Sequence, residues 1–166
     1  MRVEDRDPDT LDRPAWNSLQ ENYTKHDTAE AAFLEQLPES VDVESFGIDK
    51  RHEDEQLIYD DKPDFRLYVG GEPTALVDVK SKSGDRYMRE CNERHYRKYL
   101  AKADELDLPA YVYFYNVKTG SHVFCQVDDE ATTTSADGLD TWPDGNNKAR
   151  LETIVGWKKF IDTIHT

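Results

Sequence analysis

The chain is poor in cysteine and has no long apolar run. Its 166 residues include only Cys91 and Cys125, which have neither CxxC spacing nor the density of a disulfide scaffold. No apolar run approaches the ~20 residues that a membrane span needs, and residues 1–5 lack the apolar core of a signal peptide. We therefore expect a cytoplasmic protein with no membrane partner.

Positive charge is also scarce. The 21 Lys and Arg residues face 35 Asp and Glu residues, for a formal net charge of −14, which taken alone argues against a nucleic-acid partner. The aromatic share of 11% argues against a wholly disordered acidic tail. The Asp-rich and Thr-rich composition resembles that of proteins from salt-loving archaea and their viruses, although an ordinary acidic protein would also fit. In molar salt the Debye length falls to about 3 Å, so net charge would then say little about partners.

The length fits one compact domain. Residues 1–13 are polar and without periodicity, so we expect a flexible lead-in before a single domain over residues 14–166. Helical patterns cover 15–23 and a second segment capped by Asp27 or Thr28, and Pro38 ends the second. The predicted apolar face of that segment is Ala31, Phe33, Leu34 and Leu37.

Extended patterns alternate with further helical ones. Strands are expected at 41–48, 57–59, 65–69, 75–80, 110–117 and 122–127. A long helix is expected over 86–106, a long and disordered loop over 128–147, and an amphipathic closing helix over 148–164. Tyr111, Tyr113 and Tyr115 alternate on one strand, which favours core packing over base stacking. The order predicts an α/β domain with a mixed central sheet flanked by helices.

The central hairpin carries the chemistry. Gly70-Gly71 is a hairpin signal between two strands, so Asp64 before the first strand would meet Asp78 and Lys80 on the second. Asp78 and Lys80 lie two residues apart and project from the same face. Converging carboxylates repel each other unless a cation lies between them, and Mg²⁺ prefers oxygen ligands. The alternative is an ordinary ion pair between Asp78 and Lys80, but the apolar neighbours predict a central strand, where unpaired charges are rare.

These residues resemble a known family. Pro63-Asp64, thirteen residues, then Asp78-Val79-Lys80 looks like the PD-(D/E)xK signature of the restriction-endonuclease-like fold, which includes archaeal Holliday-junction resolvases, restriction enzymes and phage exonucleases. The resemblance covers about residues 28–127. It implies a Mg²⁺- or Mn²⁺-dependent nuclease that cuts DNA, with Asp64, Asp78, the Val79 carbonyl and Glu30 as metal ligands and Lys80 positioning the attacking water. Some branches carry Gln-x-x-x-Tyr on the second helix, where this chain has His95 and Tyr99.

Basic residues gather in one stretch between positions 80 and 102. Those that lead away from the predicted centre, and that could contact phosphates, are Lys82, Arg86, Arg94, Lys98 and Lys102. A solvated helix face that balances acidic neighbours is the competing interpretation. Dimers are common among junction and duplex cutters of the family, so a homodimer is possible, although no segment indicates one.

Two other functions fit the same residues. The first is a catalytically silent nucleic-acid-binding or structural module with the same fold. The second is an acidic adaptor whose tyrosine-rich strand recruits a protein partner. Retention of both carboxylates and the lysine favours the enzyme.

Overall fold

The computed structural model describes residues 13–46 and 62–166, with side chains described from Thr24 onward in the first helix. The strand predicted at 57–59, residues 47–48 of the strand predicted at 41–48 and nearly all of the predicted lead-in lie outside these ranges. The helices are α1 (Arg13–Gln36), α2 (Glu93–Leu106), α3 (Thr134–Asp137) and α4 (Trp157–Ile164). The strands are β1 (Val41–Ser45), β2 (Phe65–Val69), β3 (Glu72–Lys82), β4 (Glu90–Asn92), β5 (Ala110–Asn116), β6 (His122–Val127), β7 (Thr132–Thr133), β8 (Lys148–Arg150) and β9 (Thr153–Ile154).

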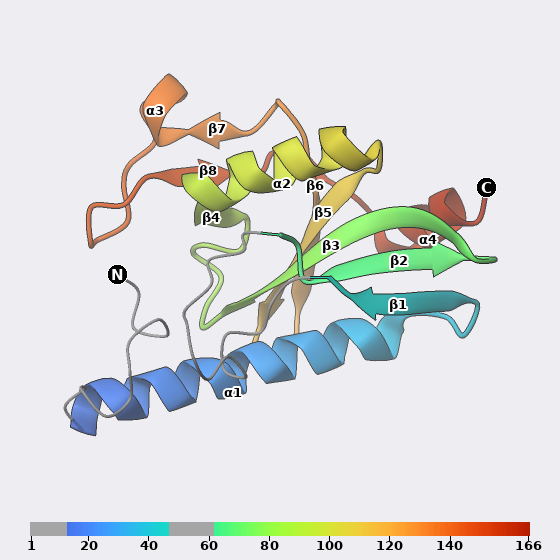
Figure 1. Cartoon of the computed structure of the whole chain (residues 1–166). Helices are drawn as coiled ribbons and strands as arrows, with labels where there is room; N and C mark the ends of the chain where they lie inside the picture. Colours follow the sequence, from blue (N-terminus) through green and yellow to red (C-terminus); the bar gives the residue numbers. More distant parts are fainter. Residues whose placement is uncertain (1–12, 47–61) are drawn as a thin grey trace, which may run out of the picture.

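The central sheet is mixed, as the sequence predicts. Its strand order is β1-β2-β3-β5-β6-β9. The β3–β5 pair is parallel, and the other neighbours are antiparallel. A small antiparallel sheet, β4-β8-β7, lies beside it. Figure 1 shows α1 and α2 on opposite sides of the central sheet, so the chain has an α/β fold with flanking helices. In the described ranges no helix is both long and apolar enough to cross a bilayer.

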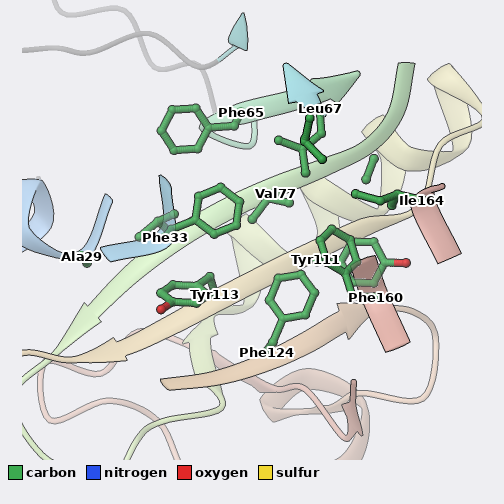
Figure 2. Close-up of a cluster of buried hydrophobic side chains, with 13 residues drawn as sticks. Ala29, Phe33, Phe65, Leu67, Val77, Tyr111, Tyr113, Phe124, Phe160 and Ile164 are labelled. Atoms are coloured by element: carbon green, nitrogen blue, oxygen red, sulfur yellow. The ribbon is translucent and has the colours of Figure 1, made fainter. Parts of the chain in front are cut away.

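Each face of the central sheet buries its own apolar cluster, because alternate residues of a strand point to opposite faces. On the α1 side, Phe33 packs against Phe65 and Tyr113, with ring centroids 5.8 Å and 5.3 Å apart, and Phe160 of α4 completes this core (Figure 2). On the α2 side the cluster is Leu76, Met88, Cys91, Tyr96, Tyr99, Ala110, Val112, Phe114, Cys125, Val127, Ala149 and Leu151. Tyr111 and Tyr113 are buried in the first cluster, which confirms that this strand packs in the core.

The first helix corrects the prediction of two helical segments. Residues 13–36 form one helix. Thr28 does not cap a new segment, because its hydroxyl donates to the carbonyl of Thr24 one turn earlier, a bond that leaves the helix continuous. The predicted apolar face is confirmed in part: Phe33 is buried and Leu37 packs against the same core, whereas Ala31 and Leu34 are exposed. Ala29, which was not predicted, is buried as well.

The helix predicted over 86–106 begins only at Glu93. Residues 90–92 form β4 and pair with β8, and the backbone N–H of Glu93 donates to the Asn147 carbonyl. Residues distant in sequence therefore supply the hydrogen bonds of this segment. Met88 and Cys91 are buried, but they reach the core from non-helical backbone.

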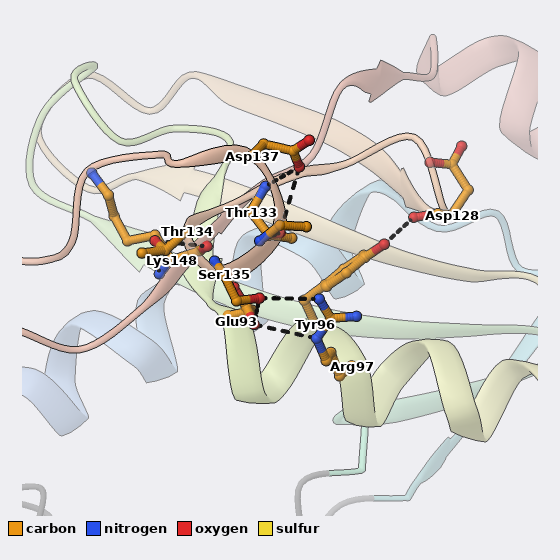
Figure 3. A network of polar contacts seen from close by, with 10 residues as sticks. Glu93, Tyr96, Arg97, Asp128, Thr133, Thr134, Ser135, Asp137 and Lys148 are labelled. Atoms are coloured by element: carbon orange, nitrogen blue, oxygen red, sulfur yellow. Dashed lines mark hydrogen bonds and ion pairs between the residues drawn. The ribbon is translucent and has the colours of Figure 1, made fainter.

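The C-terminal third departs most from the prediction. The segment 128–147, predicted to be a disordered loop, contains β7 and α3. Glu93 accepts hydrogen bonds from the backbone N–H and the hydroxyl of Ser135, at 2.9 and 2.6 Å, and Thr133 caps α3 (Figure 3). The helix predicted over 148–164 shortens to α4, because residues 148–150 and 153–154 pair with other strands.

Candidate metal centre

Asp64, directly before β2, lies opposite Asp78 of the neighbouring strand β3. The β2–β3 register pairs Phe65 with Val77, which brings Asp64, the residue before β2, next to Asp78. The backbone N–H of Asp64 donates to Oδ1 of Asp78 at 3.2 Å. The backbone N–H of Val79 donates to Oδ2 of Asp64 at 3.0 Å. Each carboxylate is thus held by backbone of the opposite strand, and the sequence prediction that the hairpin gathers these side chains is realised in the geometry.

One oxygen of Asp78 has no hydrogen bond. The residue is only 3% exposed, and its Oδ2 is buried without a hydrogen-bond partner. Lys80 Nζ lies 3.2 Å from that oxygen, close enough for an ion pair although the angles do not make a hydrogen bond. The ammonium of Lys80 offsets part of the free energy that burial of this charged oxygen costs, and a metal ion nearby would offset more of it.

Burial and nearby negative charge raise the pKa of the Asp64 carboxyl. Burial, and then the charge of Asp78, raise the pKa of the Asp64 carboxyl well above 3.8, against the opposing effects of His26, the Val79 N–H and Lys80. For Lys80, burial lowers the pKa, but the charges of Asp78, Cys91 and Asp64 outweigh it and the pKa is raised. The lysine therefore stays an ammonium while the two carboxylates compete for positive charge.

Helix α1 contributes a predicted residue and a missed one. Glu30 lies at the centre, as predicted, and its Oε1 is 2.7 Å from Nε2 of His26. The same nitrogen lies 3.9 Å from Oδ2 of Asp64. One ligand atom from each of His26, Glu30 and Asp64 lies within 4.8 Å of the others, a spacing suited to a metal ion. His26 precedes Glu30 by four residues, so the helical period places both on one face; that spacing was the available signal.

His26 is protonated in this environment. Burial alone would lower its pKa, but the hydrogen bond with Glu30 and the charges of Asp64, Glu30 and Asp78 raise it from 6.5 to about 9. An imidazolium here neutralises part of the carboxylate charge. A metal ion would take over that task, and the neutral imidazole would then be free to act as a ligand.

A shell from α2 surrounds Lys80. Nδ1 of His95 lies 3.1 Å from Lys80 Nζ, and the ammonium stands 5.5 Å from the centre of the Tyr99 ring. Because an ammonium can only donate, Nδ1 accepts. His95 and Tyr99 are both buried, so this face fixes the lysine head group beside Asp78. Burial and then the charges of Asp78 and Asp64 hold the pKa of Tyr99 well above 10.

The predicted phosphate contacts differ in exposure and in the groups that they contact. Arg86, Arg94 and Lys98 are exposed, with the Arg86 guanidinium 5.1 Å from the Tyr87 ring centre. Lys102 forms an ion pair with Glu105 at 2.6 Å. Lys82 is partly buried, and its ammonium donates to the Glu90 carbonyl at 2.7 Å.

One ligand atom from each of His26, Glu30 and Asp64 has the spacing of a metal site. Asp78, which accepts from the Asp64 N–H, and Lys80 lie at the border of this group, and metal ligation by Asp78 stays a prediction. Val79 contacts this centre through its N–H, and metal ligation by its carbonyl stays a prediction. In comparisons with known proteins, no family model, no curated protein and no solved structure matches the chain.

Proposed function

We propose that the chain is a metal-dependent nuclease that hydrolyses phosphodiester bonds, with DNA as its substrate. The observation that carries this proposal is the convergence of the Asp64 and Asp78 carboxylates, each held by backbone of the opposite strand, with Lys80 3.2 Å from Asp78. An ordinary ion pair between Asp78 and Lys80 would not account for a second carboxylate held against it, because like charges in a partly buried site repel each other.

The roles of the residues follow from their charge and position. Asp64, Asp78, Glu30 and His26 would hold a divalent cation, which when bound polarises a phosphate oxygen and lowers the pKa of an attacking water. Lys80 remains protonated, so its ammonium donates to the water or to charge that develops on the phosphate. His95 keeps that ammonium in place. Backbone N–H groups hold both carboxylates before substrate arrives, so little reorganisation is needed.

The imidazole of His26 bears on the choice of metal. Mg²⁺ prefers oxygen ligands and keeps its waters, whereas imidazole nitrogen suits transition ions better. We propose that the centre works with Mn²⁺ as well as with Mg²⁺. Replacement of His26 by Gln should then weaken Mn²⁺ activation more than Mg²⁺ activation, which initial rates over a series of metal concentrations would show.

Cleavage assays with labelled DNA test the proposal. The protein is incubated in molar KCl with linear duplex, single-stranded and branched DNA, each with Mg²⁺, Mn²⁺ or EDTA. We expect cleavage that needs the metal and that is lost in Asp78→Ala and strongly reduced in Lys80→Ala. Matched controls are Asp162→Ala and Lys158→Ala, which change the same residue types at exposed positions of α4.

Two results would contradict the proposal. If no DNA is cut while the protein is folded by circular dichroism, the chain is not a nuclease for these substrates; binding without cleavage would then indicate the silent nucleic-acid-binding module. If cleavage persists in Asp78→Ala, it arises elsewhere or from a contaminant. Parallel assays with RNA of the same sequence separate the two nucleic acids.

A further inference from the structure

A second group of charged and aromatic side chains lies further along β3 than the metal centre. This group, the Lys82–Lys148 cluster, consists of Lys82, Tyr87, Glu90, Trp142 and Lys148. The ammonium groups of Lys82 and Lys148 stand 5.0 and 5.1 Å from the centre of the Trp142 ring. Lys148 Nζ is also 5.1 Å from the Tyr87 ring centre and 3.5 Å from Oε1 of Glu90. The rings of Tyr87 and Trp142 meet edge to face at 5.0 Å.

The cluster has an excess of positive charge. Two ammonium groups face one carboxylate, so its net charge is +1 (two minus one). Lys148 and Glu90 are both buried, at 5% and 7% exposure, and they balance each other. The excess charge is that of Lys82, whose partly buried ammonium donates to the neutral carbonyl of Glu90. A ligand with one negative charge would balance it, and a phosphodiester group carries that charge.

Hydrogen-bonding groups are left over as well. The indole N–H of Trp142 is buried and has no acceptor, and Oε2 of Glu90 is buried and has no donor. An anion with several oxygens would accept from the indole N–H and from both ammonium groups. The Glu90 oxygen needs a donor, which a water molecule beside the anion would supply.

The state of Lys82 fits the same interpretation. Burial, and next the charge of Lys80, lower the pKa of Lys82 to about 8, with Lys148 acting in the same direction against Cys91 and Glu90. An anion bound between the lysines would favour the charged form again.

Its position relative to the metal centre defines the anion further. Lys80 and Lys82 lie on the same face of β3, two residues apart, which is about 6.6 Å along a strand. Phosphates of one nucleic-acid strand follow at about 3.4 Å of axial rise. A strand with its cleaved phosphate at Lys80 would thus place a phosphate one or two nucleotides away at the cluster.

We propose that Lys82, Lys148 and the indole N–H of Trp142 bind a phosphodiester group of the substrate strand, one or two nucleotides from the bond that is cut. This inference rests on the proposed nuclease function, because it places the cut phosphate at Lys80. If the proposal holds, β8 and the residues before it form a second wall of the substrate site. Figure 3 shows the Lys148 side chain extending away from the polar network that holds this region.

Binding measurements test the site without cleavage. Fluorescence anisotropy with labelled DNA in EDTA, over a series of KCl concentrations, gives the affinity and its salt dependence. We expect Lys148→Gln to weaken binding about tenfold. The negative slope of log K against log salt should become shallower by about 0.7–0.9, the value of one phosphate contact. Lys148→Arg should keep the slope, and the exposed Lys158→Gln should change neither quantity.

Trp142→Phe keeps an aromatic ring for packing and removes only the N–H donor. It should weaken binding severalfold without altering the salt slope, because no charge is lost. Thermal unfolding of each variant shows whether it is folded, and this variant remains informative if Lys148→Gln is not. Unchanged affinity in Trp142→Phe together with an unchanged slope in Lys82→Gln would overturn the proposal.

A modified substrate locates the contact. Methylphosphonate, which is uncharged, replaces one phosphodiester at a time next to the mapped cut. We expect one position, one or two nucleotides from the cut, to slow wild-type cleavage about tenfold and to have no further effect in Lys148→Gln. If Lys148→Gln and the methylphosphonate slow cleavage independently at every position, so that their effects on the rate multiply, Lys148 does not contact any of these phosphates. If the wild type binds DNA with the predicted slope but cuts nothing, the nuclease proposal fails while the phosphate site stands.

Discussion

One substitution can test whether the candidate metal centre keeps His26 protonated. In the metal-free protein the hydrogen bond to Glu30 and the charges of Asp64 and Asp78 overcome the effect of burial and raise the pKa of His26 to about 9. The perturbation is His26→Gln, which keeps a hydrogen-bonding side chain but cannot take up a proton.

The magnitude follows from the pKa values. A rise from 6.5 to about 9 corresponds to about 3 kcal/mol at about 1.4 kcal/mol per pKa unit. The side chain is 33% exposed, so solvent screening reduces the contribution, and we expect about 1–2 kcal/mol. Because the pKa is higher in the folded than in the unfolded chain, this stability is fully present below pH 6.5. It is lost as the pH rises through about 9.

Two measurements check this expectation. Imidazole resonances, followed by NMR over pH 5–10 in EDTA, should show one histidine titrating near pH 9, and that signal should be missing in His26→Gln. Denaturant unfolding should show that the wild type loses about 1–2 kcal/mol more than the variant between pH 6.5 and 9. Saturating Mg²⁺ should lower the pKa of His26, because the cation replaces the proton. A His26 pKa near 6.5 in EDTA would refute the electrostatic picture of the centre.

Three further predictions concern other parts of the fold. Asp78→Asn should abolish cleavage and lower the metal-free melting temperature, because it leaves the Lys80 ammonium without the carboxylate 3.2 Å away; thermal unfolding in EDTA measures this, and an unchanged melting temperature would contradict it. Phe33→Ala should cost about 3–5 kcal/mol in denaturant unfolding, since Phe33 is fully buried between three aromatic rings; a loss under about 1 kcal/mol would show that α1 does not pack there. Thr133→Ala should cost about 1 kcal/mol, because its hydroxyl accepts from the Ala136 N–H at the start of α3; an unchanged unfolding midpoint would argue against the cap.

The central hairpin could be predicted because its information is local. Alternating apolar residues defined β2 and β3, and Gly70 and Gly71 both have positive φ, the backbone conformation that glycine adopts at least cost. Once the hairpin is placed, the two-residue spacing of Asp78 and Lys80 puts them on one face. Chain geometry over some twenty residues was therefore enough to bring these side chains together.

The segments that were predicted wrongly depend on distant partners. Residues 90–92 and 148–150 lie near the starts of stretches whose apolar side chains have helical spacing, but they pair with each other across the chain. The order of 128–147 comes from Glu93, which no local pattern indicates. His26 was missed for a different reason, because a lone histidine acquires a role only when the helix faces a carboxylate from another element.

The distribution of charge reconciles an acidic chain with a polyanionic substrate. The formal charge of −14 repels DNA at long range, but at about 0.15 M salt this repulsion is screened beyond about 8 Å. Lys82, two residues along β3 from Lys80, stands at the same Trp142 ring as Lys148. If the proposed function holds, short-range contacts decide affinity once the long-range field is screened, so the chain would need salt to approach DNA and these lysines to hold it. We therefore expect DNA binding to strengthen from low to moderate salt and to weaken only at higher salt concentrations.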